Sequence, residues 1–261
     1  MSGVGRVGEC IQILRPDWTL SGVNAGFTQR TGGFSQAPYD SLNLALHVGD
    51  DAAAVRENRR RLVEYERLAE EPRWLKQVHG ARVVHASDVE RDVIEADAVW
   101  TDQPGEVCAV LVADCVPILM AANDGHCVAA IHAGWRGLAA GVIEATIEAL
   151  PVAANDLSAV IGPCIGKDAY EVGPEVIEAL DEAMPVSPQF SQIKASQESR
   201  LTERDAFWLD MAASAEAVLR HAGVPTPRLL GHCTHTQDKQ YYSYRRDGVS
   251  GRVAGFIALS G

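Results

Sequence analysis

Residues 107–150, VCAVLVADCVPILMAANDGHCVAAIHAGWRGLAAGVIEATIEAL, decide the fold of this chain. Two apolar runs within them, Val107–Ala113 and Cys127–Ile131, are typical of buried strands. Each run leads into side chains that can react, Asp114-Cys115 after the first and His132 after the second. We therefore expect two buried strands to end at a chemically active site.

A glycine-flanked turn and a helix follow the second run. The turn is Ala-Gly-Trp-Arg-Gly at residues 133–137, and apolar residues at helical spacing predict a helix from about Leu138 to Leu150. The backbone N–H groups of such a turn, together with a helix N-terminus, favour anions. This turn is therefore a candidate ligand-binding segment.

The composition is that of a globular protein without a basic surface. The chain has 261 residues, of which 47% are hydrophobic and 22% are charged, and its net charge is −12. Nucleic acids and anionic membranes call for basic patches, so neither is an expected partner. No apolar run approaches the roughly 20 residues that cross a bilayer. We also expect no secretory signal, because the first ten residues contain no apolar segment.

Six cysteines are scattered along the chain, and none of them form a CxxC pair. A chain of this size can build a core without disulfides. We therefore expect reduced thiols and a cytoplasmic protein. The oligomeric state is open, and a monomer is compatible with the sequence.

Outside residues 107–150, strands and helices are mixed without strict βαβ alternation. The expected strands are Cys10–Leu14, Val23–Thr28, Trp74–Val78, Arg82–His85, Ser158–Ile161, Leu229–Gly231 and Val253–Leu259. The expected helices run from Asp50 or Asp51 to about Tyr65, from Pro174 to about Ala183, and over about Asp205–Ala222. Residues 1–8 are expected to be flexible, and residues 185–204 to form a polar surface excursion. This order predicts one α+β domain over residues 1–261, with mixed β-sheets flanked by helices.

Three residues can be assembled into a metal site. His79, Cys115 and His132 each stand at the end of an expected strand, and three strand ends can converge at one edge of a sheet. Two imidazoles and a thiolate suit Zn²⁺ and leave a fourth position for water or substrate. The same residues also fit a buried cysteine with hydrogen-bonded histidines, because ligands far apart in sequence carry no motif. Cys115 and His132 fit a third interpretation, a thiolate nucleophile with its general base.

Further polar residues are candidates for binding or for support. Arginines beside glycine turns are suited to phosphate or carboxylate, and the clearest is Arg136. The others are Arg30, Arg245 and Arg246. The segment from His232 to His235 is interpreted as structural, and Cys108 and Cys127 as inert core. Asp97, Asp102 and Asp114 are candidates to orient a histidine or to act as acid or base, although such residues more often cap turns.

Several sequence blocks occur in an order that resembles a known family. They are Ser41-Leu42-Asn43-Leu44, His47-Val48-Gly49-Asp50, Lys76-Gln77-Val78-His79-Gly80, Ala113-Asp114-Cys115-Val116-Pro117, His132-Ala133-Gly134-Trp135-Arg136-Gly137, Gly162-Pro163-Cys164-Ile165 and Ser243-Tyr244-Arg245-Arg246-Asp247-Gly248. Together they resemble the laccase-domain family, also called multicopper polyphenol oxidase-like proteins or peptidoglycan editing factor. The resemblance runs from about residue 20 to the C-terminus.

The resemblance implies a single α+β domain and a Zn²⁺ held by His79, Cys115 and His132, with Cu²⁺ as the alternative metal. The family's reported activities are phosphorolysis of adenosine, inosine, guanosine or methylthioadenosine, and deamination of adenosine. The implied partners are therefore a purine nucleoside and phosphate. In phosphorolysis, Arg136 with Arg30 would hold phosphate against the ribose. In deamination, zinc would lower the pKa of a bound water to about 7. Candidates for the rest of the pocket wall are Asn43, Cys164, Tyr170 and Arg245.

Three other functions stay open at this point. One is a cysteine hydrolase or amidase that edits a peptidoglycan precursor, with Cys115 as nucleophile. Another is a copper-dependent polyphenol oxidase, although multicopper oxidases need His-x-His pairs and none of the eight histidines form one. The last is a binding module without turnover.

Overall fold

The computed structural model describes residues 10–18, 20–193 and 206–260. The predicted flexibility of residues 1–8 and most of the predicted excursion at 185–204 lie outside these ranges. The strands are β1 (Ile13–Leu14), β2 (Val23–Thr28), β3 (Val83–His85), β4 (Ala98–Thr101), β5 (Val107–Val112), β6 (Val116–Ala122), β7 (Val128–Ala133), β8 (Leu157–Ile161), β9 (Glu171–Val172), β10 (Phe190–Ile193), β11 (Ala206–Leu209), β12 (Arg228–Leu229) and β13 (Val253–Leu259). The helices are α1 (Ala52–Glu66), α2 (Trp135–Ala139), α3 (Val142–Ala149), α4 (Pro174–Ala183), α5 (Met211–His221) and α6 (Tyr244–Asp247).

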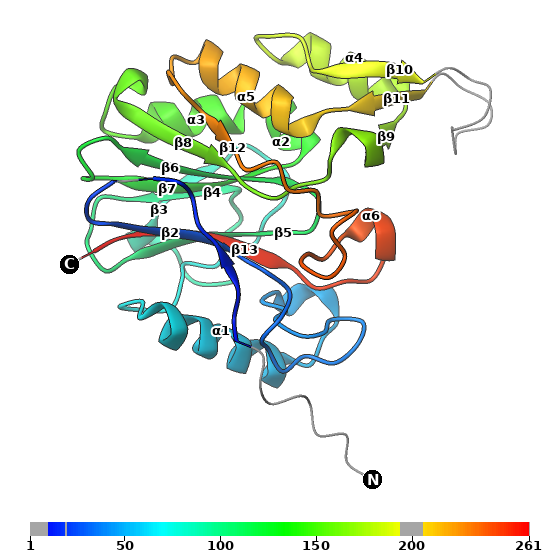
Figure 1. The fold of residues 1–261 in the computed structure, drawn as a ribbon. Helices are drawn as coiled ribbons and strands as arrows, with labels where there is room; N and C mark the ends of the chain where they lie inside the picture. The colour runs from blue at the N-terminus through cyan, green and yellow to red at the C-terminus, as the bar shows by residue number, and fades with distance from the viewer. Residues whose placement is uncertain (1–9, 19, 194–205, 261) are drawn as a thin grey trace.

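Two sheets stack between helices, as Figure 1 shows. A four-stranded antiparallel sheet, ordered β1-β2-β13-β5, lies between α1 and a six-stranded sheet. The six-stranded sheet, ordered β12-β8-β6-β7-β4-β3, is mixed, because its two edge pairs are parallel and its inner pairs antiparallel. Helices α2 to α5 cover its other face, and a small sheet β10-β11-β9 lies beside them. The predicted α+β fold with mixed sheets and flanking helices is confirmed.

Alternation of side chains along the central strands separates three cores. On β5, Leu111 packs with the residues around α1, whereas Val110 packs between the two sheets. On β6, Leu119 faces the layer between the sheets, whereas Met120 faces helices α3 to α5. All residues of β5, β6 and β7 are buried, so their apolar runs carry both faces of the sandwich.

Several predicted elements are confirmed and others are corrected. The bounds of β2, β13 and α4 agree with the prediction, and Asp51 caps α1 by accepting a hydrogen bond from the N–H of Ala53. Residues 74–78 form no strand, since only isolated bridges occur there. No helix in the described part of the chain is long and apolar enough to cross a membrane.

The corrections in the central stretch have local causes. Strand β6 was not predicted, because Pro117 removes a backbone donor and argues against a central strand. The helix predicted over 138–150 is two helices, α2 and α3, and they are separated at Gly141, whose φ of 80° is left-handed. The helix predicted from Asp205 begins only at Met211, and residues 206–209 pair in the small sheet as β11.

The two main sheets make close contact at Phe27. This ring is fully buried and lies against two glycines, Gly255 on the neighbouring strand β13 and Gly162 at the end of β8. A Cβ added at Gly162 would overlap the ring of Phe27. Gly162 therefore sets the spacing between the sheets just before the turn that leads to the site.

We expect Gly162→Ala to lower the free energy of unfolding by about 1–3 kcal/mol, the usual cost of overpacking a core. Chemical denaturation of the variant measures this loss. Phe27→Leu alone should also lower the free energy of unfolding. In the double variant it should restore part of the free energy that Gly162→Ala removes, because the smaller side chain leaves room for the added Cβ. Additive losses in the double-mutant cycle would contradict the proposed contact.

Candidate metal centre and active site

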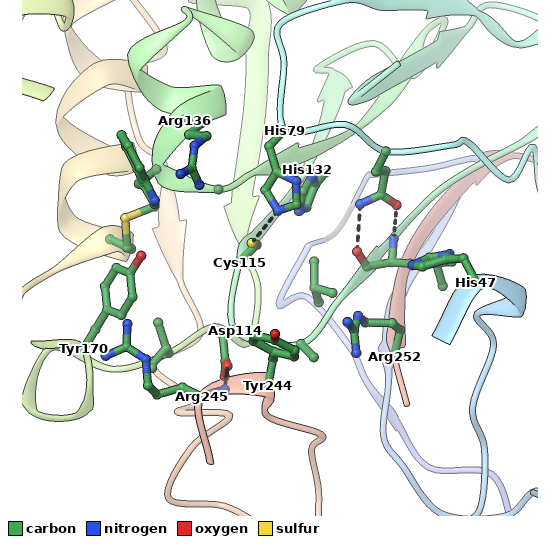
Figure 2. Close-up of a pocket in the computed structure, with 18 residues that line it drawn as sticks. His47, His79, Asp114, Cys115, His132, Arg136, Tyr170, Tyr244, Arg245 and Arg252 are labelled. Carbon is green, nitrogen blue, oxygen red and sulfur yellow. Dashed lines mark hydrogen bonds between the residues drawn. The ribbon is translucent and has the colours of Figure 1, made fainter. Parts of the chain in front are cut away.

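The structure brings His79, Cys115 and His132 together, and their potential ligand atoms all lie within 4.8 Å of one another (Figure 2). Their positions differ in detail from the predicted strand ends. His79 lies in a turn that follows no strand, Cys115 lies in the turn between β5 and β6, and His132 lies within β7. Strands β6 and β7 are adjacent at the centre of the six-stranded sheet, so Cys115 and His132 lie near each other where β6 begins and β7 ends. The turn that carries His79 lies beside them.

Asp97 holds two of these three side chains in place. Its carboxylate is completely buried and accepts hydrogen bonds from the N–H groups of His79 at 2.9 Å and Gly80 at 2.7 Å. The same carboxylate lies 2.8 Å from Nδ1 of His132. His79 has a left-handed φ of 61°, which turns consecutive N–H groups toward one point. Asp97 therefore fixes both the turn that carries His79 and the ring of His132.

The negative charge of the Cys115 thiolate and the positive charge of the His132 imidazolium stabilise each other. Burial alone would raise the pKa of Cys115, but the charge of His132 and hydrogen bonds from both histidines outweigh it and lower the pKa to about 6. Burial alone would lower the pKa of His132, but Cys115 and Asp97 raise it to about 9. Near pH 7 the metal-free site therefore holds a thiolate and an imidazolium.

This donor set fits a zinc ion. The Sγ atom of Cys115 lies 3.8 Å from Nε2 of His79, a separation compatible with two ligands of one tetrahedral ion. Nδ1 of His132 is bonded to Asp97, which leaves Nε2 as its ligand atom. The low pKa of Cys115 supplies the thiolate that a metal requires.

A cavity of about 420 Å³ opens beside the three residues. Arg136, Arg245 and Arg252 line it, and so do the aromatic residues Trp135, Tyr170 and Tyr244 (Figure 2). The guanidinium groups lie over these rings: Arg136 is 4.3 Å from the ring of Trp135, Arg245 4.8 Å from that of Tyr170, and Arg252 5.9 Å from that of Tyr244. The cavity thus combines flat apolar walls with positive charge, which suits a flat ligand that is accompanied by an anion.

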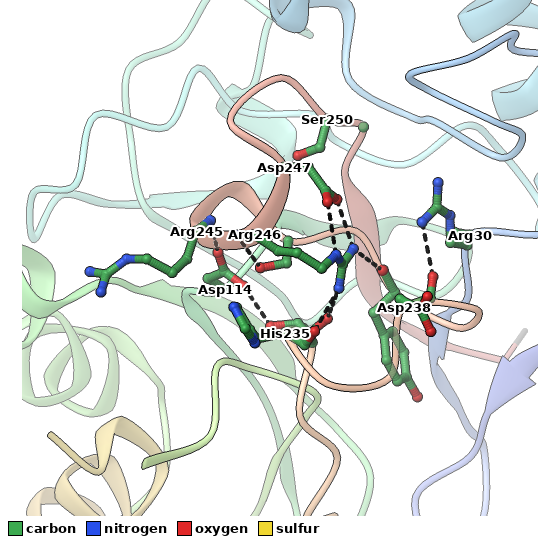
Figure 3. Close-up of polar contacts among 12 residues, drawn as sticks. Arg30, Asp114, His235, Asp238, Arg245, Arg246, Asp247 and Ser250 are labelled. Carbon is green, nitrogen blue, oxygen red and sulfur yellow. Dashed lines mark hydrogen bonds and ion pairs between the residues drawn. The ribbon is translucent and has the colours of Figure 1, made fainter. Parts of the chain in front are cut away.

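A C-terminal loop contributes one wall of the cavity. The carboxylate of Asp114 accepts a hydrogen bond from the N–H of Arg245 at 2.7 Å and one from the hydroxyl of Thr234 at 2.7 Å. Arg246 donates to the carbonyls of Thr234 and His235 and ties the loop together (Figure 3). The two adjacent arginines therefore differ, since Arg246 holds the loop and Arg245 faces the cavity.

Three predicted pocket residues do not line the cavity. Arg30 donates a hydrogen bond to the carbonyl of Asp238 (Figure 3). It also donates to the carbonyl of Asp40 and lies over the ring of Tyr242. Asn43 is completely buried beneath the surface, and Cys164 is buried next to the cavity-lining Ile165.

Residues predicted to be structural lie outside the metal group. The ring of His232 contacts the hydroxyl of Tyr241, and Asp102 contacts His85. Cys108 and Cys127 are buried, and burial raises the pKa of both thiols, that of Cys127 to about 11. All six cysteines are free in the structure.

Several residues that line the cavity were not predicted as site residues, among them Gln77, His47 and Arg252. Gln77 exchanges two hydrogen bonds of 2.8 Å with the backbone of Leu111, which fastens the His79 turn to β5. Gln77 and His47 stand in blocks that carry the family resemblance, and that signal could have identified them. Arg252 belongs to no such block, and its position after Gly251 did not distinguish it from the other arginines of the chain.

An α+β sandwich with a His–Cys–His group beside a ligand-sized cavity is the architecture of a candidate metalloenzyme. A family model described as multi-copper polyphenol oxidoreductase laccase matches residues 24–260, so this chain belongs to that family.

Named relatives and a solved structure extend the comparison. The chain is 45% identical over 247 residues to a purine nucleoside phosphorylase of Pseudomonas aeruginosa, covering 94% of this chain and 98% of the relative. It is 40% identical over 250 residues to purine nucleoside phosphorylase YfiH of Escherichia coli, covering 95% and 99%. A crystal structure from Neisseria meningitidis, 38% identical, superposes with a TM-score of 0.86 over 95% of this chain and 99% of that one.

Asp97→Asn should weaken zinc binding about 10- to 100-fold, the usual effect of removing a carboxylate that orients a histidine ligand. Competition with a chromogenic chelator measures the affinity. The matched control is Asp124→Asn, since Asp124 also contacts a histidine, His126, but on the exposed surface. Equal zinc affinity in the Asp97 variant and in the wild type would show that the carboxylate does not organise the site.

The thiol of Cys115 should react with iodoacetamide at unusually low pH in metal-free protein. Because its pKa is lowered to about 6, the thiolate persists above that pH and is lost as the pH falls through it. The alkylation rate, followed by mass spectrometry, should be half-maximal near pH 6, whereas an ordinary thiol has its midpoint near about 8.5. His132→Gln removes the positive charge and should move the midpoint upward. A wild-type rate that still rises steeply above pH 8 would contradict the thiolate assignment.

Proposed function

We propose that this protein is a zinc-dependent purine nucleoside phosphorylase. The observation that carries the proposal is the His79–Cys115–His132 group beside a cavity of about 420 Å³ lined by three arginines. Pockets for small ligands start near 300 Å³, so the volume is sufficient for a nucleoside with phosphate. The names of the relatives, purine nucleoside phosphorylases that are covered almost completely, support the same reaction.

Each part of the cavity has a role in this proposal. A zinc ion bound to the three ligands supplies Lewis-acid stabilisation of negative charge on an oxygen. Tyr170 and Trp135 pack against the flat purine, and Arg136 and Arg245 donate hydrogen bonds to oxygens of the nucleoside. Burial raises the pKa of Tyr170 to about 12, so its hydroxyl stays protonated and donates a hydrogen bond to the ligand.

The proposed substrates are adenosine, inosine, guanosine and methylthioadenosine, with deamination of adenosine as a second activity. Each of these molecules consists of a flat purine joined to a ribose ring, so one aromatic cavity can accept them all. We also propose a cytoplasmic location, where nucleosides and phosphate are both present.

A cysteine amidase acting on a peptidoglycan precursor is the second candidate. It is favoured by one observation, the thiolate–imidazolium pair of Cys115 and His132 with Asp97 2.8 Å from the histidine ring. A nucleophile, a base and an orienting carboxylate in this order are typical of cysteine hydrolases.

Copper-dependent oxidation of phenols has less support. Among residues 10–18, 20–193 and 206–260, one group of three ligands could hold an ion, and it is His79, Cys115 and His132. Cu²⁺ at this single site remains an alternative occupant, because imidazole and thiolate also suit copper.

Incubation of the purified protein with adenosine, with and without phosphate, tests the proposal. After the zinc content is measured, chromatography should resolve adenine only when phosphate is present. Inosine would show the deamination. His79→Ala should lose at least about 100-fold in rate, because one ligand of the metal is gone. The matched control is His126→Ala, at an exposed histidine outside the cavity, and it should retain the wild-type rate. If zinc-loaded protein formed neither adenine nor inosine, this result would overturn the nucleoside reaction and favour the amidase.

A further inference from the structure

Arg252 lies at one end of the cavity and forms no ion pair with any of the described residues. It is the least exposed of the three arginines that line the cavity, since Arg136 and Arg245 are exposed and Arg252 is half-buried. Among the described residues, no carboxylate lies within ion-pair distance of its guanidinium, whose only hydrogen bonds there go to Ser250 and Gly251. A partly desolvated charge without a partner is costly, so an anionic ligand would relieve that cost.

The guanidinium is held in a fixed position. Its Nη1 atom donates to the carbonyls of Ser250 at 2.8 Å and Gly251 at 3.0 Å. In the described part of the chain, Nε and Nη2 make no hydrogen bond, and Figure 2 shows the guanidinium directed toward the cavity. Two N–H groups on one planar fork match two oxygens of a phosphate.

His47 lies at the same end of the cavity (Figure 2). It belongs to the short 3₁₀ helix Leu46–Val48, and its ring has no hydrogen-bond partner among the described residues. Partial burial of the ring and the charge of Arg252 lower the pKa of His47. A histidine ring offers an N–H donor in either protonation state.

Asn43 explains why two residues so far apart in sequence meet. Its Oδ1 accepts a hydrogen bond from the backbone N–H of Arg252 at 2.9 Å, and the N–H of Leu44 bonds the carbonyl of Arg252 at 3.3 Å. Its Nδ2 donates to Asp50 at 2.9 Å, on the far side of the helix that carries His47. Asn43 is therefore a positioning residue beneath Arg252 and His47, and it is shielded from the cavity.

We propose that Arg252 and His47 form a subsite for a phosphate group, at the end of the cavity opposite Arg136 and Tyr170. Among the described residues, Nε and Nη2 of Arg252 and the ring of His47 have no hydrogen-bond partner. These groups and the positive charge of Arg252 line the cavity at that end. The identification of the ligand with the phosphate co-substrate rests on the proposed function. The recognition chemistry does not, because the same donors would bind a phosphate ester carried by a nucleotide.

Titration of the purified protein with inorganic phosphate by calorimetry, without nucleoside, tests the subsite. The wild type should bind phosphate saturably, and Arg252→Gln should weaken the binding about tenfold or more, as expected when a charge-assisted pair is lost. Arg252→Lys keeps the charge and should fall between the two. His47→Gln, at an exposed side chain, should weaken binding about threefold. The charge-matched control is Arg60→Gln on the exposed face of α1, and it should bind as the wild type does.

Each outcome bears on the subsite. If inorganic phosphate fails to bind but adenosine 5′-monophosphate binds in an Arg252-dependent way, the subsite takes a phosphate borne by the substrate. Unchanged affinity for both ligands in Arg252→Gln and His47→Gln, or no binding of either ligand by the wild type, would overturn the proposal. If Arg252→Gln does not fold, Arg252→Lys and His47→Gln decide. Phosphate binding that depends on Arg252 without any phosphorolysis would contradict the proposed function and leave the subsite intact.

Discussion

The buried carboxylate of Asp97 is the interaction on which the candidate site depends. It accepts hydrogen bonds from three backbone N–H groups of the His79 turn and faces the ring of His132, so one group aligns ligands from a turn and from a strand. Burial alone would raise the pKa of Asp97, but hydrogen bonds from His132 and Gly80 outweigh it and lower the pKa. The carboxylate thus stays ionised near pH 7, and its charge in turn favours the imidazolium of His132.

The sandwich of sheets makes that burial possible. Strands β6 and β7 have apolar side chains on both faces, so the edge where the site lies is backed by two cores. Loops from three distant parts of the chain then close over this edge, and each is fastened by a polar side chain. Gln77 fixes the first loop to β5, Asn43 fixes the second to Arg252, and Asp114 fixes the third to Arg245. The scaffold is apolar and periodic, whereas the site is assembled by individual hydrogen bonds.

This difference explains what the sequence could predict. Periodic patterns predicted the fold class and the bounds of β2, β13 and α4, since burial of a face leaves a repeat in the sequence. Strand β6 was not predicted because Pro117 interrupts the pattern expected of a central strand. Helix α5 was predicted too long because the apolar residues of β11, which precede it, resemble the start of an apolar helix face. The chemistry of the three residues of the metal group made them one candidate among several, and the family resemblance singled them out. Arg252 was not, because its meeting with Asn43 joins positions 209 residues apart and leaves no local trace.

The charge of the cavity restricts which ligands can bind more than the shape of the cavity does. The chain as a whole carries a net charge of −12, yet three arginines and one carboxylate, Asp114, line its cavity. Among the described residues, no carboxylate forms an ion pair with the guanidinium groups of these arginines. A divalent metal on two neutral imidazoles and one thiolate would add a further positive charge. A neutral nucleoside alone cannot balance this field, whereas a nucleoside with phosphate can. An amidase substrate would need anionic groups of its own to fit the same cavity. The electrostatics therefore favour reactions in which an oxyanion is a reactant, and phosphorolysis is the simplest of these.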